Sequence, residues 1–191
     1  MATRHRKAAG PIAIGLVLLL AAGHPLPASG HHTPIHEYEV KAAFLYNFTK
    51  FVTWNWSVPS RDAEEPFVIG VVGENPFGDA LALLERKTVR GRPIVVRNVE
   101  TLESLRSCRM AFVSSSEESR LPAILQGAHA RNILTVGDMD RFAARGGVIG
   151  LVMRGDRVGF EINVDAARRA GLTVSSKLLS LAAAVHRDEG R

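Results

Sequence analysis

The first residues to test for chemistry are two glycines that follow a short apolar run. Gly73 and Gly78 have the spacing of a phosphate-binding loop after a strand. That motif continues with Lys and with Ser or Thr, whereas Asp79 and Ala80 follow here. An acidic side chain at this place repels phosphate. The pair therefore predicts a turn between a strand and a helix, and no G-x-G-x-x-G dinucleotide fingerprint occurs anywhere in the chain.

Motifs for nucleophilic and zinc catalysis are incomplete in the same way. His36 and Glu37 begin like the H-E-x-x-H helix of zinc proteases, but Val40 stands where the second histidine is required. The serines at 114–116 do not lie in a G-x-S-x-G elbow, and residues 175–177 do not match S-x-x-K. These serines are typical of helix caps. We therefore predict that the protein is not an enzyme and needs no cofactor or metal.

One conditional metal site depends on where a leader is cleaved. Cleavage after Ala28 would leave a mature start of Ser29, Gly30 and His31. A free amine with a histidine in the third position can bind Cu(II) or Ni(II) in a square plane. Cleavage after Gly30 would remove this site, and a start without metal is the expected outcome.

A polar cluster near the C-terminus is a candidate binding site. If residues 157–163 form a strand, Glu161 and Asn163 share one face with Arg157. Arg168 and Lys177 follow on predicted helices. These side chains could form a polar pocket, or they could make ordinary surface salt bridges, which are common and weak.

Aromatic residues are concentrated in one segment and indicate a second binding region. Seven of the twelve aromatic residues lie between positions 38 and 56. Three of them, Phe44, Phe48 and Phe51, are placed to pack a helix onto a sheet. Trp54 and Trp56 point the same way if the chain is extended there. They are the better candidates for a partner surface, since tryptophan is enriched at the centres of interfaces.

The elements that must position these residues alternate along the chain. Residues 36–53 predict a long helix, and later apolar runs predict strands separated by helices of about ten residues. We expect strands at 67–72, 93–97, 110–113, 132–136, 148–153 and 157–163. We expect helices at 77–85, 99–106, 115–130 (capped by Ser115 or Ser116) and 139–144 (capped by Asp138), then one ending at Gly171 and one capped by Ser175. This order predicts an α/β fold, a three-layer Rossmann-like sandwich with a mostly parallel sheet and an antiparallel hairpin near the C-terminus.

The first 30 residues are typical of a secretory signal peptide. Arg4, Arg6 and Lys7 precede an apolar run at 12–22, and small residues follow at 28–30. That run is shorter than the roughly 20 residues that cross a membrane as an uncleaved anchor. We therefore expect a periplasmic protein with one domain, residues 31–191. The single cysteine, Cys108, is either buried and unreactive or the site of an intermolecular disulfide.

The charge balance argues against nucleic acid as a partner. The formal charge of +5 includes three basic residues of the leader, and the rest of the chain carries 21 basic and 19 acidic side chains. No segment has the dense basic stripe that neutralises phosphates.

Several blocks in order resemble the YfiR-like family, and the resemblance covers nearly all of residues 36–187. The longest is E-V-K-A-A-F-L-Y-N-F-T-K-F-V-T-W at 39–54. Shorter blocks are N-P-F-G at 75–78, G-R-P-I at 91–94, L-T-V at 134–136, G-G at 146–147, F-E-I-N at 160–163, A-G-L at 170–172 and S-S-K-L-L at 175–179.

This resemblance implies a periplasmic repressor of an inner-membrane diguanylate cyclase. In such a system the repressor holds the cyclase's periplasmic domain inactive until an outer-membrane lipoprotein sequesters it, and release promotes biofilm formation. It also implies a homodimer. We place partner or effector contacts at Trp54, Trp56, Arg92, Glu161, Asn163, Arg168 and Lys177. Family members often pair cysteines, which this chain cannot do within itself. A periplasmic sensor of a small molecule, binding it in the Glu161 and Asn163 pocket, is the alternative, and an unrecognised hydrolase is a third.

Overall fold

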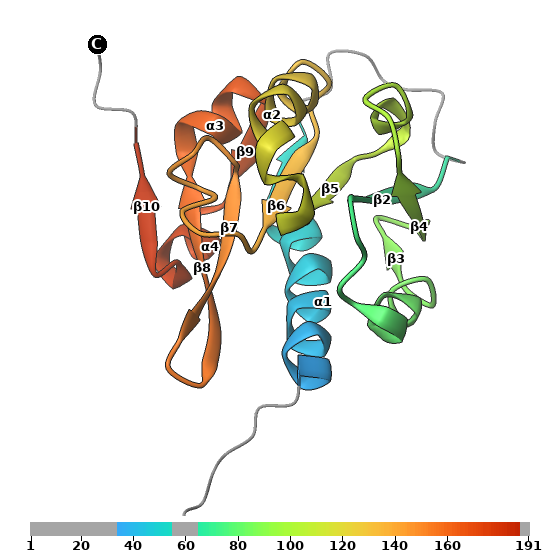
Figure 1. Cartoon of the computed structure of the whole chain (residues 1–191), viewed down its shortest axis with the longest axis horizontal. Coiled ribbons are helices and arrows are strands. Elements are labelled where there is room, and N and C mark those ends of the chain that lie inside the picture. The colour runs from blue at the N-terminus through green and yellow to red at the C-terminus, as the bar shows by residue number, and fades with distance from the viewer. Residues whose placement is uncertain (1–33, 55–64, 188–191) are drawn as a thin grey trace, which may run out of the picture. The chain divides into compact units, whose positions relative to one another are not determined.

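A long N-terminal helix opens the described part of the chain. The computed structural model describes residues 34–54 and 65–187 (Figure 1). Helix α1 spans Pro34–Phe51 and runs directly into strand β1, Val52–Trp54. Proline suits the first turn of a helix because its missing N–H has no partner there. The predicted helix is confirmed, although its last two residues are already extended. No helix in the described residues has both the length and the apolar character needed to cross a membrane.

Eight strands form the main sheet, and five of its seven neighbouring pairs are parallel. The order across the sheet is β10-β8-β7-β6-β5-β2-β4-β3, and the pairs β7–β8 and β4–β3 are antiparallel. The bounds are β2 Phe67–Val72, β3 Thr88–Val89, β4 Arg92–Val99, β5 Met110–Val113, β6 Leu134–Gly137, β7 Ile149–Arg154, β8 Arg157–Asn163 and β10 Ala184–His186. The α/β class and the antiparallel hairpin are confirmed, and the sheet is mixed. A separate antiparallel pair joins β1 to β9, Leu172–Val174.

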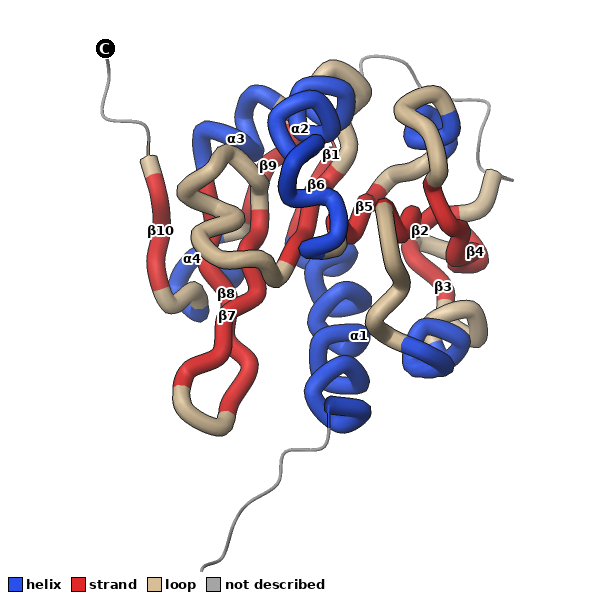
Figure 2. The backbone as a smooth tube through the Cα atoms, in the orientation of Figure 1, coloured by secondary structure: helices blue, strands red, loops and turns tan. Residues whose placement is uncertain are grey.

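Helices lie against both faces of this sheet. Alternate residues of β2 face opposite sides, so Ile69 belongs to one apolar cluster and Val68 to the other. The first cluster contains the buried residues of α1, and the second contains those of α2, Leu121–His129. Two short helices follow late in the chain, α3 Val164–Arg169 and α4 Ser176–Leu181. Figure 2 shows these helices among the strands.

A buried charged cluster fixes α1 to the end of β6. Lys41 is only 4% exposed, and its Nζ lies 2.6 Å from the Asp138 carboxylate. Glu37 forms a second ion pair with the same amine, and the Tyr38 hydroxyl donates to Asp138 at 2.9 Å. The Tyr38 ring packs edge-on against Phe77, which follows β2. The cluster therefore joins α1 to two loops at the carboxyl ends of the parallel strands.

The expected helix at 139–144 is wrong, and Asp138 explains why. Residues 140–146 form turns, and the Asp138 side chain binds Lys41 and Tyr38 rather than capping a helix.

Three other predicted helices are replaced, wholly or in part, by 3-10 segments. In place of 99–106 there is only a 3-10 turn at Ser104–Ser107, preceded by hydrogen bonds between Thr101 and Ser104. The helix expected from 115 begins as a 3-10 segment, Ser115–Arg120, capped by Ser114 rather than by Ser115 or Ser116. The helix expected at 77–85 is a 3-10 segment at Gly78–Leu83. Ser175 caps α4 as predicted.

The sequence patterns identified the long buried strands and missed the short ones. The strands at 67–72 and 110–113 have the predicted bounds. The four strands β1, β3, β9 and β10 have only two or three residues each. Segments this short carry no detectable alternation of polar and apolar residues.

Replacing Asp138 should strongly destabilise the fold. In Asp138→Ala the Lys41 ammonium stays buried with only Glu37 as a partner, which should lower the free energy of unfolding by about 3 kcal/mol. Urea unfolding measures this change. Asp140→Ala, at an exposed neighbouring position, is the matched control and should change stability little. Equal effects of the two variants would contradict the proposed role of the ion pair.

The same cluster should make the protein sensitive to alkaline conditions. Burial and the Asp138 carboxylate raise the pKa of Tyr38 above 10.0. Burial lowers the pKa of Lys41, but hydrogen bonds to Asp138 and Glu37 outweigh it and the net pKa lies above 10.5. Folding therefore holds both protons more tightly, so this contribution to stability is complete below the unfolded pKa values and is lost as the pH rises through the folded ones.

Tyr38→Phe should reduce that alkaline loss of stability while leaving the ring in place. The measurement is urea unfolding at several pH values between about 8 and 11. Tyr46→Phe, on the same helix, serves as the control and should follow the wild type. A Tyr38→Phe profile as steep as that of the wild type would rule out the phenol as a contributor.

Candidate functional site

A groove between strand β8 and the segment leading into β10 is the candidate partner-binding site. Its volume is about 420 Å³. We call it the β8–β10 groove, and its lining comes from α1, the β7–β8 hairpin and the end of α4. The residues are Phe44, Arg154, Arg157, Val158, Gly159, Phe160, Leu181, Ala182 and Ala183. In Figure 2 the hairpin extends beyond the rest of the sheet and β10 runs along its outer edge.

The floor of the groove is rigid because its rings belong to the core. Phe160 is buried, and its ring lies 5.6 Å from that of Phe44 and 5.3 Å from that of Phe48. The backbone of Ala183 donates to the Phe160 carbonyl at 2.7 Å, which fixes the opposite wall. A partner would therefore meet a preformed apolar surface rather than one that must first become ordered.

Large apolar side chains stand exposed around this floor. Leu181 is 63% exposed, Met153 is 44% exposed and Val185 is 39% exposed. They lie on α4, on the hairpin and on β10. Three of the five large apolar residues that are exposed in the described part of the chain thus belong to the elements around this groove. Clustered exposure of this kind is typical of protein interaction sites.

Two arginines give the groove a positive rim. Arg154 and Arg157 face each other directly across the β7–β8 hairpin. Both are exposed, and like charges in directly opposed strand positions repel. The only acidic residue in the two-residue turn between them is the exposed Asp156. This rim favours a partner that carries a carboxylate next to an apolar side chain.

The outer edge of the sheet lies beside the groove. Strand β10 pairs with β8 on one side only, since it is the last strand in the order across the sheet. Glu161 on β8 contacts His186 on β10 at 2.9 Å, so this pair fastens the edge strand. An open strand edge offers backbone groups to a partner.

The polar pocket expected from Glu161 and Asn163 is replaced by separate local contacts. Glu161 binds His186, as described above. Asn163 is buried, donates to the Ala143 carbonyl at 2.9 Å and accepts from the Ala166 N–H at 2.8 Å. It caps helix α3. The buried Asn163 amide thus serves as a helix cap, and the Glu161–His186 contact corresponds to the ion-pair alternative of the sequence analysis.

The other predicted site residues lie in different places. The Trp54 ring is buried against Phe67, and its Nε1 donates to a backbone carbonyl, so the expectation of an exposed ring is wrong. Trp56 lies outside the described residues. Arg92 opens β4 and is half-buried. Arg168 pairs with Asp165 on its own helix, and Lys177 lies 5.7 Å from the Phe51 ring.

Sequence reasoning located the F-E-I-N strand but missed the residues that shape the groove around it. Leu181 and Ala183 follow the last predicted helix, where no motif marks them. Arg154 and Arg157 carry a signal that was available. The predicted turn covered residues 154–156 and so placed Arg154 inside it, whereas the observed turn is Gly155-Asp156 alone, and the residues that flank a two-residue hairpin turn must face each other.

Comparison with known proteins indicates a family and a fold. A family profile described as YfiR/HmsC-like matches residues 38–183. No curated protein matches the chain.

Two solved structures resemble this chain in fold. One is a conserved domain protein from Vibrio cholerae O1 biovar El Tor, with 13% identity and a TM-score of 0.54. The other is an ABC domain in complex with L-Trp from Streptococcus pneumonia, with 11% identity and a TM-score of 0.51. Each match covers 78% of this chain and 60% of the other, so this chain spans less than two thirds of either. At such low identity the likeness concerns the fold alone.

Removing one hairpin arginine should stabilise the isolated protein. Arg154→Gln abolishes the repulsion with Arg157 and should raise the free energy of unfolding by about 0.5 kcal/mol. Urea unfolding at low ionic strength measures the difference. Arg86→Gln changes the net charge equally at an exposed position and should leave stability unchanged. If Arg154→Gln also leaves the free energy of unfolding unchanged, Asp156 already compensates the charges of both arginines. The two arginines then do not repel each other, which contradicts the prediction.

Proposed function

Because this chain belongs to the YfiR/HmsC-like family, we propose that it is a periplasmic regulator that represses an inner-membrane diguanylate cyclase. The observation that carries the proposal is the family match over residues 38–183. The regulator binds the periplasmic domain of the cyclase and holds it inactive. Cyclic di-GMP production and biofilm formation then increase when an outer-membrane lipoprotein removes the regulator. The family is a regulatory one, so the proposed role is binding and not catalysis.

The β8–β10 groove supports this role because it suits a protein segment of defined chemistry. Its floor is formed by Phe160, and Leu181 is exposed at its wall. An apolar side chain of the cyclase's periplasmic domain fits this floor. A neighbouring Asp or Glu of the same segment would lie between Arg154 and Arg157, whose mutual repulsion it would relieve. The partner thus gains both apolar burial and charge pairing at one place.

The route to the periplasm rests on residues 1–30, the proposed signal peptide, which lie outside the described residues. In the proposed homodimer, we assign the second copy to the open edge of β10, one of the two edges of the main sheet. We propose that the partner and the second copy use neighbouring surfaces, the groove and the strand edge.

Deletion of the gene should raise cellular cyclic di-GMP, and the wild-type gene should restore the low level. A gene carrying Leu181→Glu should fail to restore it, because a carboxylate at the groove wall repels the acidic partner segment. The measurement is cyclic di-GMP quantified by mass spectrometry in each strain. An unchanged level after deletion would contradict the proposed function itself.

Leu83→Glu is the matched control for the groove. Leu83 is a similarly exposed leucine on the 3-10 segment Gly78–Leu83, away from the groove lining. This variant should restore repression as the wild type does, at equal protein abundance in the periplasm. Repression lost with Leu83→Glu and kept with Leu181→Glu would place the partner on a different surface.

A further inference from the structure

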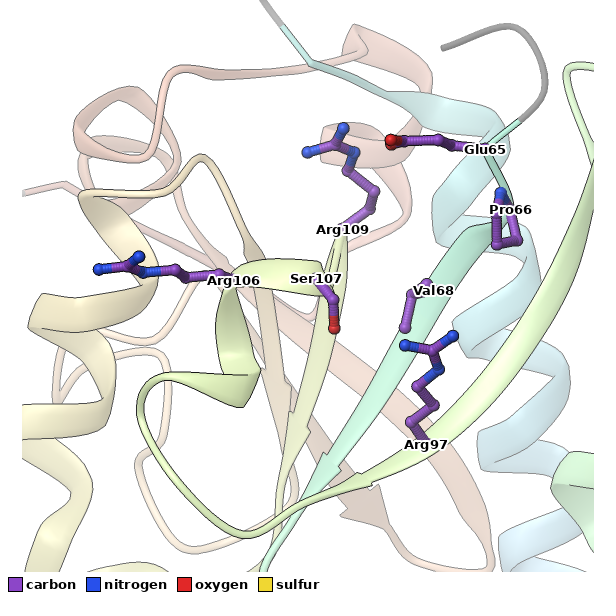
Figure 3. Close-up of a pocket in the computed structure, with 7 residues that line it drawn as sticks. All are labelled: Glu65, Pro66, Val68, Arg97, Arg106, Ser107 and Arg109. Atoms are coloured by element: carbon purple, nitrogen blue, oxygen red, sulfur yellow. The ribbon is translucent and has the colours of Figure 1, made fainter.

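The main sheet has a second edge, which is formed by β4. This strand has eight residues, and β3 pairs only with the first two of them. Beyond Pro93 the outer side of β4 therefore has no neighbouring strand within the described residues. On the inner side, residues 94–99 all pair with β2. Figure 3 shows these two strands side by side, with Val68 on β2 and Arg97 on β4.

The short β3 leaves most of this edge uncovered because the chain approaches β4 only at a tight hairpin. Arg90 and Gly91 form the two-residue turn, with φ angles of 53° and 83°. Positive φ at both positions is typical of the type I′ turn that joins neighbouring strands. Residues 84–86 form another turn, so β3 is limited to Thr88 and Val89.

The inner side of β4 is packed closely and holds the strand in place. A Cβ at Gly70 of β2 would lie 2.7 Å from a methyl carbon of Val99, the last residue of β4. The same Cβ would lie 2.6 Å from the Cys108 Sγ in the turn before β5, so only glycine allows this approach. The outer N–H groups of β4 are therefore presented at fixed positions.

A side chain occupies the place of a neighbouring strand along this edge. The Ile94 N–H donates to the Lys87 carbonyl at 3.2 Å. Two residues further, the Val96 N–H donates to Oε1 of Glu85 at 3.1 Å. Backbone N–H groups two residues apart lie on the same side of a strand. The Glu85 carboxylate thus accepts the hydrogen bond that a carbonyl of a further strand would otherwise accept.

The backbone on both sides of Glu85 is fixed, so this contact is not that of a freely moving surface side chain. Leu84 is only 2% exposed and belongs to the apolar cluster that contains α1. On the other side, Lys87 bonds Ile94 through its carbonyl, and its Nζ lies 5.1 Å from the Tyr46 ring centroid. Glu85 itself is exposed between these two anchors.

Without Glu85, the β4 edge would be suited to pairing with another strand. Residues 94–96 are Ile, Val and Val, which favour strands. The part of β4 beyond β3 is longer than the three-residue strand β10 at the other edge. A long apolar edge with free N–H groups is a template for another chain, and proteins commonly block such edges with charged side chains.

We propose that Glu85 closes the β4 edge to a second copy of this chain. A second β4 could pair there only after the carboxylate had released the Val96 N–H, and in a symmetric pair both copies would have to release it. Of the two edges of the main sheet, this leaves β10 available to another copy. The inference concerns the purified chain and does not depend on the proposed repression of a cyclase.

Sedimentation equilibrium of the purified protein tests the proposal. Glu85→Ala should raise the weight-average mass by about twofold or more over that of the wild type, because each chain gains a pairing surface. Glu85→Gln keeps an oxygen acceptor and should retain the wild-type mass. Glu100→Ala removes the same charge at an exposed position directly after β4 and should also retain it. An unchanged mass for Glu85→Ala, or an equal rise for Glu100→Ala, would overturn the proposal.

Amide hydrogen exchange at Val96 distinguishes strand pairing from association of a misfolded chain. In dilute Glu85→Ala this amide should exchange faster than in the wild type, because its acceptor is gone. At high protein concentration the amide of the variant should become protected again, as a second strand accepts its hydrogen bond. A raised mass without this concentration-dependent protection at Val96 would locate the association elsewhere and overturn the proposal.

Discussion

The arrangement of the described residues depends on one buried charge, the ammonium of Lys41. A lysine that is 4% exposed is stable only when its charge is compensated, and here Glu37 and Asp138 do so together. Asp138 follows β6 directly, so the requirement to pair this charge fixes the position of α1 along the strands. A helix held by apolar contacts alone could slide or rotate at lower cost, since apolar contacts are not directional.

Once α1 is fixed, its aromatic residues and those of β1 hold two separate parts of the fold. In its middle, Phe44 lines the β8–β10 groove and packs against Phe160. Just past its end, the Trp54 Nε1 donates to the Arg109 carbonyl next to β5. The aromatic residues described in this segment therefore serve mainly to connect the groove and the start of β5 to one core.

The elements that carry a clear apolar pattern in the sequence were predictable. The roles of residues that depend on a single tertiary contact were not. The strand at 67–72 is buried on both faces, so its composition alone identifies it. In contrast, the amide of Asn163 could either contact a ligand or cap a helix. Only its hydrogen bond to the Ala143 carbonyl, which the sequence does not reveal, decides between these roles. Trp54 is decided in the same way by a backbone oxygen 55 residues away. The groove requires the three-residue strand β10, which is too short to leave a pattern.

The approach of the turn before β5 to Gly70 also determines the chemistry of the one thiol. Cys108 is 1% exposed, and its burial raises the pKa of the thiol, an effect that a hydrogen bond from Ser107 and the charge of Arg97 only partly oppose. The protonated, enclosed sulfur is a poor nucleophile and is out of reach of oxidants and of other chains. Disulfide-linked dimers are thereby disfavoured, so any second copy must be held by noncovalent contacts. The folded polypeptide therefore presents no accessible thiol, and a thiol-based response to oxidants would have to originate in another component.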